Sequence, residues 1–175
     1  MLVYVSGGCK NGKTDLAQQI AVKLSGERRR VYLATMLPYD DEDRARIQKH
    51  IENRKGLGFE TAEEGRDILS VLDRYGTDAV YLIDSVTALV QNASYPKDRS
   101  EDMKRDIIEF AKKASDAVFV SDCIFSEAQC YSEETLKYMR SLAAVDKEMA
   151  QLCDVVIEIC GGNIIYHKGK GLIRL

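Results

Sequence analysis

The sequence predicts a single α/β domain over residues 1–175, with a mainly parallel sheet flanked by helices. Short β-branched runs alternate with longer amphipathic stretches, as in sheets whose parallel strands are joined through helices. The short runs are almost continuously apolar, which is typical of strands buried on both faces. The length of 175 residues is usual for one domain and sufficient to bury a core.

Five strands are expected from the apolar runs, at residues 2–6, 31–35, 79–84, 117–121 and 155–160. Residues 13–24 and 102–114 repeat apolar side chains at helical spacing. Two further helices are predicted at residues 41–54, which begin with acids, and 132–152, which begin with a serine that can cap a helix. Gly161 and Gly162 separate two apolar runs, which predicts a C-terminal antiparallel hairpin.

The composition is that of an ordinary globular protein. Hydrophobic residues make up 45% of the chain and charged residues 30%, which argues against disorder and against a membrane protein. No apolar stretch is long enough to span a bilayer. The net charge of −3 gives no overall positive field, so no nucleic-acid partner is expected. The basic run at residues 28–30 is predicted to be a solvated loop.

The cysteine pattern predicts a cytoplasmic protein with free thiols. The five cysteines are an odd number without Cys-x-x-Cys spacing, and two histidines are too few to complete a zinc site. Reduced thiols of this kind are typical of the cytoplasm. The first residues lead directly into the apolar run Leu2-Val3-Tyr4-Val5, which is predicted to be a core strand and not a signal peptide.

A glycine-rich turn between the first strand and the first helix carries the strongest chemical signal. It matches the Walker A pattern through Gly7, Gly8, Cys9, Lys10, Asn11, Gly12, Lys13 and Thr14. The glycines let main-chain N–H groups converge on a phosphate, and the helix adds its positive N-terminus. Lys13 is expected to reach the β- and γ-phosphates, and the Thr14 hydroxyl to bind Mg²⁺. The sequence therefore predicts a P-loop NTPase fold of the RecA-like kind that binds ATP or GTP.

A second magnesium ligand is predicted at Asp84. This residue follows the apolar run Tyr81-Leu82-Ile83 at the carboxyl end of a strand, where open α/β sheets bind ligands. The alternative is that Asp84 caps the next helix, because short polar residues favour that position.

The segment after the P-loop has an ordered pattern of its own. Ala34-Thr35 ends a strand, acids follow at residues 40–42, and Arg46-Ile47 precedes His50 and Arg54 at fixed spacing. Further on come the segments at residues 61–63 and 84–92. From residue 1 to about 92 the chain thereby resembles the adenosylcobinamide kinase/adenosylcobinamide-phosphate guanylyltransferase family of cobalamin biosynthesis, which has an Arg-Ile-x-x-His-x-x-x-Arg helix, a Thr-x-Glu segment and an acid-Cys-x-Thr-x-x-Val-x-Asn stretch.

The resemblance implies two reactions in one site. ATP or GTP would phosphorylate the hydroxyl of adenosylcobinamide, and GMP would then pass from GTP to that phosphate through a guanylylated histidine. His50 would be the nucleophile, since a neutral imidazole is nucleophilic near neutral pH. Arg54 lies one helical turn later and could pair with phosphate oxygens, while Lys13 and Mg²⁺ would neutralise the leaving pyrophosphate. His167 lacks such a pattern and is expected to be an ordinary solvated histidine.

The resemblance also implies an assembly and further nucleotide contacts. The family suggests a homotrimer. Outside the P-loop, the implied contacts are Ala34, Thr35, Met36, Ile51, Glu52, Asn53, Arg54, Glu63 and Asp84. The C-terminal half departs from the family, because Ser121-Asp122-Cys123-Ile124 stands where the family has Asn-Glu-Val-Gly, and of this segment only an acid, Asp122, remains. Asp146 stands where the family has asparagine.

Two other functions stay open at this point. The chain could be a different P-loop small-molecule kinase, in which only the γ-phosphate moves and His50 is incidental. It could also be a RecA-like ATPase or regulatory module, although this short, slightly acidic chain shows neither a basic surface nor a partner domain. The choice between ATP and GTP, the acceptor, and the retention of both activities are also open.

Overall fold

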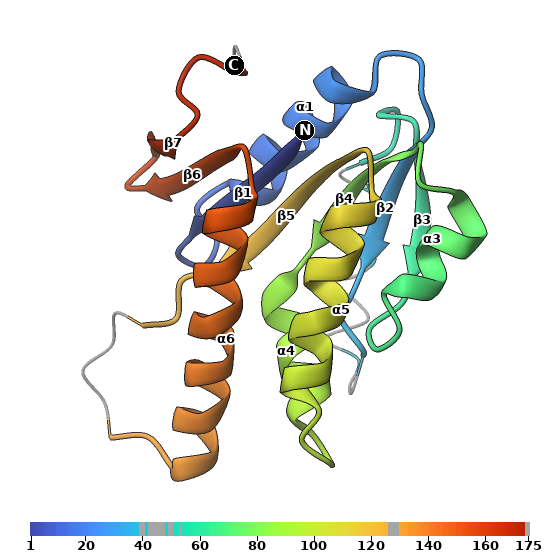
Figure 1. Ribbon diagram of the computed structural model, residues 1–175. Coiled ribbons are helices and arrows are strands. Elements are labelled where there is room, and N and C mark those ends of the chain that lie inside the picture. Colours follow the sequence, from blue (N-terminus) through green and yellow to red (C-terminus); the bar gives the residue numbers. More distant parts are fainter. Residues whose placement is uncertain (39–40, 42–47, 49–50, 53, 126–129, 174–175) are drawn as a thin grey trace.

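The computed structural model describes residues 1–38, 41, 48, 51–52, 54–125 and 130–173. Its strands are β1 Leu2–Gly7, β2 Arg30–Ala34, β3 Phe59–Glu63, β4 Val80–Asp84, β5 Asp116–Asp122, β6 Val155–Cys160 and β7 Asn163–Lys168. They form one seven-stranded sheet in the order β3-β2-β4-β5-β1-β6-β7 (Figure 1). Every neighbouring pair is parallel except β6 and β7. The predicted mainly parallel sheet with a C-terminal antiparallel hairpin is confirmed.

Helices cover both faces of this sheet. They are α1 Lys13–Ser25, α3 Leu69–Tyr75, α4 Val86–Ser94, α5 Ser100–Lys113 and α6 Glu133–Leu152. Figure 1 shows α1 on one face and α4, α5 and α6 on the other. Because successive strand residues point to opposite faces, β5 serves both layers: Val118 packs with Ile20 of α1, whereas Phe119 packs with Phe110 of α5. Because helices pack against both faces of the sheet, its central strands are apolar on both sides, as the sequence predicted.

Besides α4, which was expected only as the helix that follows Asp84, the structure contains two elements that the apolar pattern did not predict. Strand β3 lies at the edge of the sheet, pairs with β2, and has four of its five residues at least partly exposed. An edge strand with polar side chains gives no apolar run. Helix α3 has only seven residues, too few for a clear period. Both elements depend on the neighbours against which they pack.

Two serines cap helices at the side of the sheet where the strands end. The side chain of Ser132 accepts a hydrogen bond from Thr135 N at 3.2 Å, as expected for a cap of α6. Ser85 has the same role in α4, because its Oγ accepts from Ala88 N at 3.2 Å. The alternative role of Asp84 as the helix cap is therefore wrong, and its carboxylate is available for other partners.

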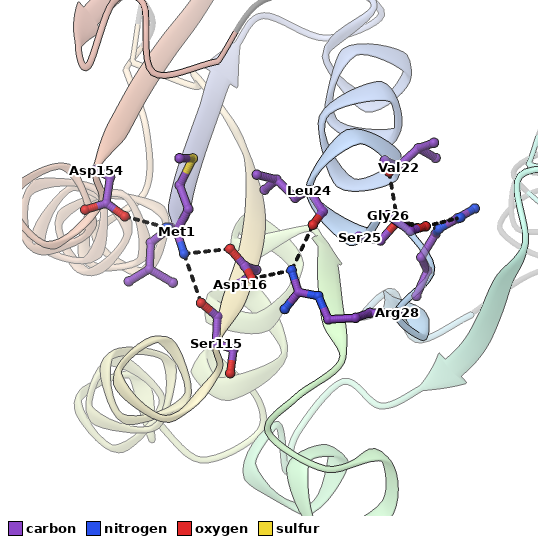
Figure 2. Close-up of polar contacts among 11 residues, drawn as sticks. Met1, Val22, Leu24, Ser25, Gly26, Arg28, Ser115, Asp116 and Asp154 are labelled. Atoms are coloured by element: carbon purple, nitrogen blue, oxygen red, sulfur yellow. Dashed lines mark hydrogen bonds and ion pairs between the residues drawn. The ribbon is translucent and has the colours of Figure 1, made fainter.

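The prediction of a solvated loop at residues 28–30 holds only in part: Arg28 and Arg29 lie in the loop between α1 and β2 and Arg29 is exposed, but Arg30 belongs to β2. Arg28 donates to Asp116 Oδ2 at 2.6 Å and to Leu24 O at 2.8 Å (Figure 2). Arg29 makes two hydrogen bonds of 2.7 Å to the carboxylate of Glu60 in β3, and Arg30 begins β2. The run lies where these strands begin, and their acids supply its partners.

Other sequence predictions can be compared directly with the structure. All five cysteines are free, and Cys153 is the buried one. Within the described residues, no helix has both the length and the apolar character of a membrane span. His167 is half exposed, and its Nε2 lies 2.8 Å from Glu158 Oε2. The hairpin turn has positive φ at both Gly161 and Gly162, as a two-residue turn of this kind requires.

Candidate active site

The P-loop joins β1 to α1 at the carboxyl edge of the sheet. Gly12 precedes α1 with a φ of 89°, which residues with a β-carbon rarely adopt. At Gly7, an added β-carbon would lie 2.2 Å from Asn11 Nδ2 and 2.6 Å from Ile159 O, so no larger residue fits. Asn11 Nδ2 donates to Ile159 O at 2.7 Å and holds the loop against β6. The motif thus has the strand-loop-helix setting that phosphate binding requires.

Lys13 begins α1 and is only 7% exposed. Its Nζ donates to Gly8 O at 3.0 Å and lies 2.6 Å from Asp122 Oδ1 at the end of β5. A buried ammonium needs such a counter-charge. A phosphate bound in the loop would therefore compete with Asp122 for Lys13.

Asp84 ends β4 at the same edge and accepts two hydrogen bonds on Oδ2. Thr14 Oγ1 donates at 3.1 Å and Tyr32 OH at 2.6 Å. Burial, and then the charge of Asp84, raises the pKa of Tyr32 far above its usual value, so this phenol stays a donor. Hydroxyl and carboxylate oxygens are the ligands that Mg²⁺ prefers. The pair Thr14 and Asp84 therefore fits a magnesium ion.

The ends of β2 and β3 bring more of the predicted contacts to this edge. Ala34 is paired in the sheet with both Asp84 and Glu63. Thr35 is fully buried; its Oγ1 donates to Ser85 O at 2.8 Å and accepts from Ser85 N at 2.6 Å. Met36 follows and is half-buried. The Thr35 side chain fastens β2 to the start of α4, and nucleotide contact by these residues stays a prediction.

Arg54 contacts the strands instead of solvent and is 5% exposed. Its Nη2 donates to Thr61 Oγ1 at 2.9 Å, and its guanidinium carbon lies 4.1 Å from the centre of the Tyr32 ring. Burial lowers the pKa of Arg54 despite the nearby charges of Asp84 and Glu63. Through Tyr32, Arg54 is thus linked to Asp84. Its predicted role as a phosphate partner stays a prediction.

The predicted nucleophile His50 and the predicted contact Asn53 lie outside the described residues. Of the residues near them, Ile51 and Glu52 are helical, and Glu52 Oε1 accepts from Gln48 Nε2 at 3.2 Å. The roles assigned to these four positions stay predictions.

Sequence reasoning missed a polar cluster beside the P-loop. Asp122 N donates to Thr87 Oγ1 at 2.7 Å. At the preceding residue of β5, Ser121 Oγ donates to Asp146 Oδ1 at 3.0 Å, and this oxygen also accepts from Tyr4 OH. Burial raises the pKa of Asp146. The cluster joins α4, α6 and two strands, and its only sequence signal is that polar residues interrupt otherwise apolar elements near the strand ends.

Comparison with a protein family covers nearly the whole chain. The family described as cobinamide kinase / cobinamide phosphate guanyltransferase (CobU) matches residues 3–166. This match extends across the C-terminal segments that depart from the family pattern. Among curated proteins, none matches the chain significantly.

Two solved structures show the relationship of the fold. The flagellar accessory protein FlaH from Methanocaldococcus jannaschii is 13% identical with a TM-score of 0.52, and the match covers 95% of this chain and 77% of FlaH. The second structure is the ATPase domain of another protein; it is 11% identical with a TM-score of 0.55, and the match covers 97% of this chain and 77% of that domain. These similarities confirm the RecA-like P-loop fold. The family match, which spans nearly the whole chain, establishes that the chain belongs to the cobinamide kinase / cobinamide phosphate guanyltransferase family of nucleotide-dependent transferases in cobalamin biosynthesis.

Proposed function

We propose that this protein phosphorylates adenosylcobinamide with ATP or GTP and then transfers GMP from GTP to the phosphate through guanylylated His50. The observation that carries the proposal is the convergence of Lys13, Thr14 and Asp84 at one edge of the sheet, in a chain that belongs to this family. It works as a cytoplasmic homotrimer.

The phosphate-binding half of the site supports phosphoryl transfer. Lys13 Nζ projects along the loop to Gly8 O, where the ammonium can meet the β- and γ-phosphates of a nucleotide. Thr14 and Asp84 would hold Mg²⁺, which supplies charge neutralisation between the phosphates. Tyr32 orients the Asp84 carboxylate by its hydrogen bond. Catalysis of this reaction consists largely of such positioning and charge stabilisation.

Guanylyl transfer rests on His50, which the family pattern singles out. The imidazole attacks the α-phosphorus and displaces pyrophosphate, and the phosphorylated acceptor then takes GMP from the histidine. Two displacements replace one difficult reaction between two anions. Arg54, four residues later, stabilises charge in these steps and forms no bond to phosphorus.

The decisive experiment is incubation with α-labelled GTP and magnesium. We expect covalent GMP on His50, through a phosphorus–nitrogen bond that is labile to acid and stable to alkali. His50→Ala should lose the label while it still binds GTP, and omission of magnesium should also prevent labelling. The other histidine provides the matched control, so His167→Ala should label normally.

Chromatography of the corrinoid products tests the acceptor separately. Adenosylcobinamide should become adenosylcobinamide phosphate and then the GDP derivative. Label on another residue, or none with intact nucleotide affinity, would contradict the guanylyl-transfer mechanism and favour a P-loop kinase without a covalent intermediate. If nucleotide binds but no corrinoid changes, the acceptor assignment is wrong.

A further inference from the structure

Asp122 has a fixed position beside the P-loop that the proposed mechanism has not yet used. It pairs with Gly7 in the register between β5 and β1. Its N–H donates to Thr87 Oγ1 at 2.7 Å, and the N–H of Cys123 donates to Gly7 O at 2.9 Å. These two bonds fasten the backbone on both sides of the residue, one to α4 and one to the P-loop. The carboxylate therefore projects from a well-defined point.

The ion pair with Lys13 gives this carboxylate an unusual environment. Oδ1 lies 2.6 Å from Nζ, the ammonium that P-loops direct to the β- and γ-phosphates. A phosphate bound in the loop would draw Lys13 away and leave the Asp122 carboxylate without its charged partner beside the nucleotide. Like charges repel at such distances. A residue with only a packing role would not need to be acidic here.

The other titratable groups around Asp122 are already committed. Burial, and then the charges of Asp122 and Asp146, raises the pKa of Tyr138 to about 12, so this phenol is protonated at neutral pH. Asp146 accepts hydrogen bonds from Ser121 and Tyr4. Asp84, on the next strand, accepts from Thr14 and Tyr32. Among the described carboxylates of this edge, Asp122 is the one whose charged partner is shared with the nucleotide, and its side chain is 32% exposed.

We infer that Asp122 is the base that accepts the proton of the acceptor hydroxyl during phosphoryl transfer. The inference rests on the proposed function, since it needs a hydroxyl acceptor. Nucleotide binding draws Lys13 to the phosphates and thereby frees the base only when the donor is present. The ion pair thus holds the carboxylate in place in the absence of nucleotide.

The step is balanced without any further reactant. The acceptor O–H bond breaks and its proton passes to a carboxylate oxygen of Asp122. The acceptor oxygen forms a bond to the γ-phosphorus, and the bond between that phosphorus and the bridging oxygen breaks. The electron pair leaves with the nucleoside diphosphate, close to Lys13. After product release, the Asp122 carboxylic acid returns its proton to water.

Steady-state kinetics of adenosylcobinamide phosphorylation in Asp122→Asn test the inference. We expect kcat to fall by about 10² to 10⁴, the usual contribution of a general base, with little change in KM for the nucleotide. Asp122→Glu should recover part of the lost kcat because it restores a carboxylate. Labelling of His50 by GTP should fall far less than phosphoryl transfer, since attack by the imidazole needs no proton acceptor at this position.

The matched control is Asp116→Asn, which makes the same change at the other end of β5 and should keep kcat. An Asp122→Asn enzyme with wild-type kcat would overturn the inference. So would a loss confined to nucleotide affinity, because Asp122 would then act only by holding Lys13. A thermal unfolding curve like that of the wild type excludes misfolding. If the wild type itself yields no corrinoid phosphate, the proposed function fails and the inference fails with it.

Discussion

The two ends of β5 carry the same side chain in different surroundings. Asp116 begins the strand, and its two carboxylate oxygens lie 2.6 Å from the main-chain nitrogen of Met1 and from Arg28 (Figure 2). Asp122 ends the strand with Lys13 at 2.6 Å from Oδ1. The Asp116 side chain is 14% exposed and that of Asp122 is 32% exposed. Each carboxylate oxygen of Asp116 has its own partner, whereas the partner of Asp122 is Lys13, which is also expected to bind phosphate.

This difference separates a structural acid from a reactive one. The partners of Asp116 come from segments that pack on the amino edge of the sheet, away from the P-loop. The partner of Asp122 is the P-loop lysine, at the edge where parallel α/β sheets bind their ligands. Similar distances therefore have different consequences. What matters is whether the partner leaves when a substrate arrives.

The largest effect is expected from Lys13→Ala, which removes the partner of Asp122. Affinity for a fluorescent GTP analogue should fall about ten- to a hundredfold, because a charge-assisted phosphate contact contributes about 1.5 to 3 kcal/mol. Thermal unfolding should change little. Lys112→Ala, at an exposed position of α5, is the control. Unchanged affinity in Lys13→Ala would remove the central assignment of the site.

At the other end of β5, Asp116→Asn should affect stability and spare nucleotide binding. We expect the free energy of unfolding to fall by about 1 to 2 kcal/mol. This loss is smaller than that of a fully buried charged hydrogen bond, because the Arg28 side chain is 37% exposed and solvent screens its charge. Chemical denaturation measures the loss, and the same GTP analogue tests binding. A loss of nucleotide affinity with normal stability would break the comparison between the two ends.

The variant Tyr32→Phe tests whether the hydrogen bond from Tyr32 orients the Asp84 carboxylate for magnesium. The variant loses the 2.6 Å hydrogen bond to Asp84, so stability should fall by about 1 kcal/mol and the magnesium dependence of nucleotide binding should weaken. Tyr81→Phe is matched to it, because Tyr81 is buried in β4 and its hydroxyl donates to Gly76 O away from the site. Equal magnesium dependence in the two variants would exclude an orienting role for Tyr32.

The smallest expected effect is the pH dependence of the contribution that Asp116 makes to the free energy of unfolding. Burial raises the pKa of this carboxyl, but the hydrogen bonds from the Met1 nitrogen and Arg28 outweigh burial, and the net pKa is lowered. A lowered pKa stabilises the fold above the unfolded value of about 3.9, and this contribution disappears as pH falls through the folded value. The stability difference between wild type and Asp116→Asn should therefore narrow below about pH 4. If the stability difference between the two proteins widens in acid instead, the pKa of Asp116 is not lowered in the folded state.

Much of the fold could be predicted because the central strands are buried on both faces. Such strands appear as continuous apolar runs, as in β1, β4 and β5, and each was predicted to within two residues. The edge strand β3 could not be found in this way, since it pairs with only one neighbour and exposes most of its side chains. The partners of the arginines at residues 28–30 were hidden because they belong to strands that are distant in sequence.

For the site, the phosphate loop could be predicted from local residues alone, since glycines, lysine and threonine must stand at fixed spacing to surround a phosphate. The sequence also marked Asp84 as an acid at a strand end. Only the tertiary structure placed Tyr32 on Asp84 and Asp122 on Lys13, because these contacts join residues 52 or more positions apart. Parallel strands align their carboxyl ends whatever their distance along the chain. The local pattern therefore names the groups that bind phosphate, and the sheet order decides which acids act on them.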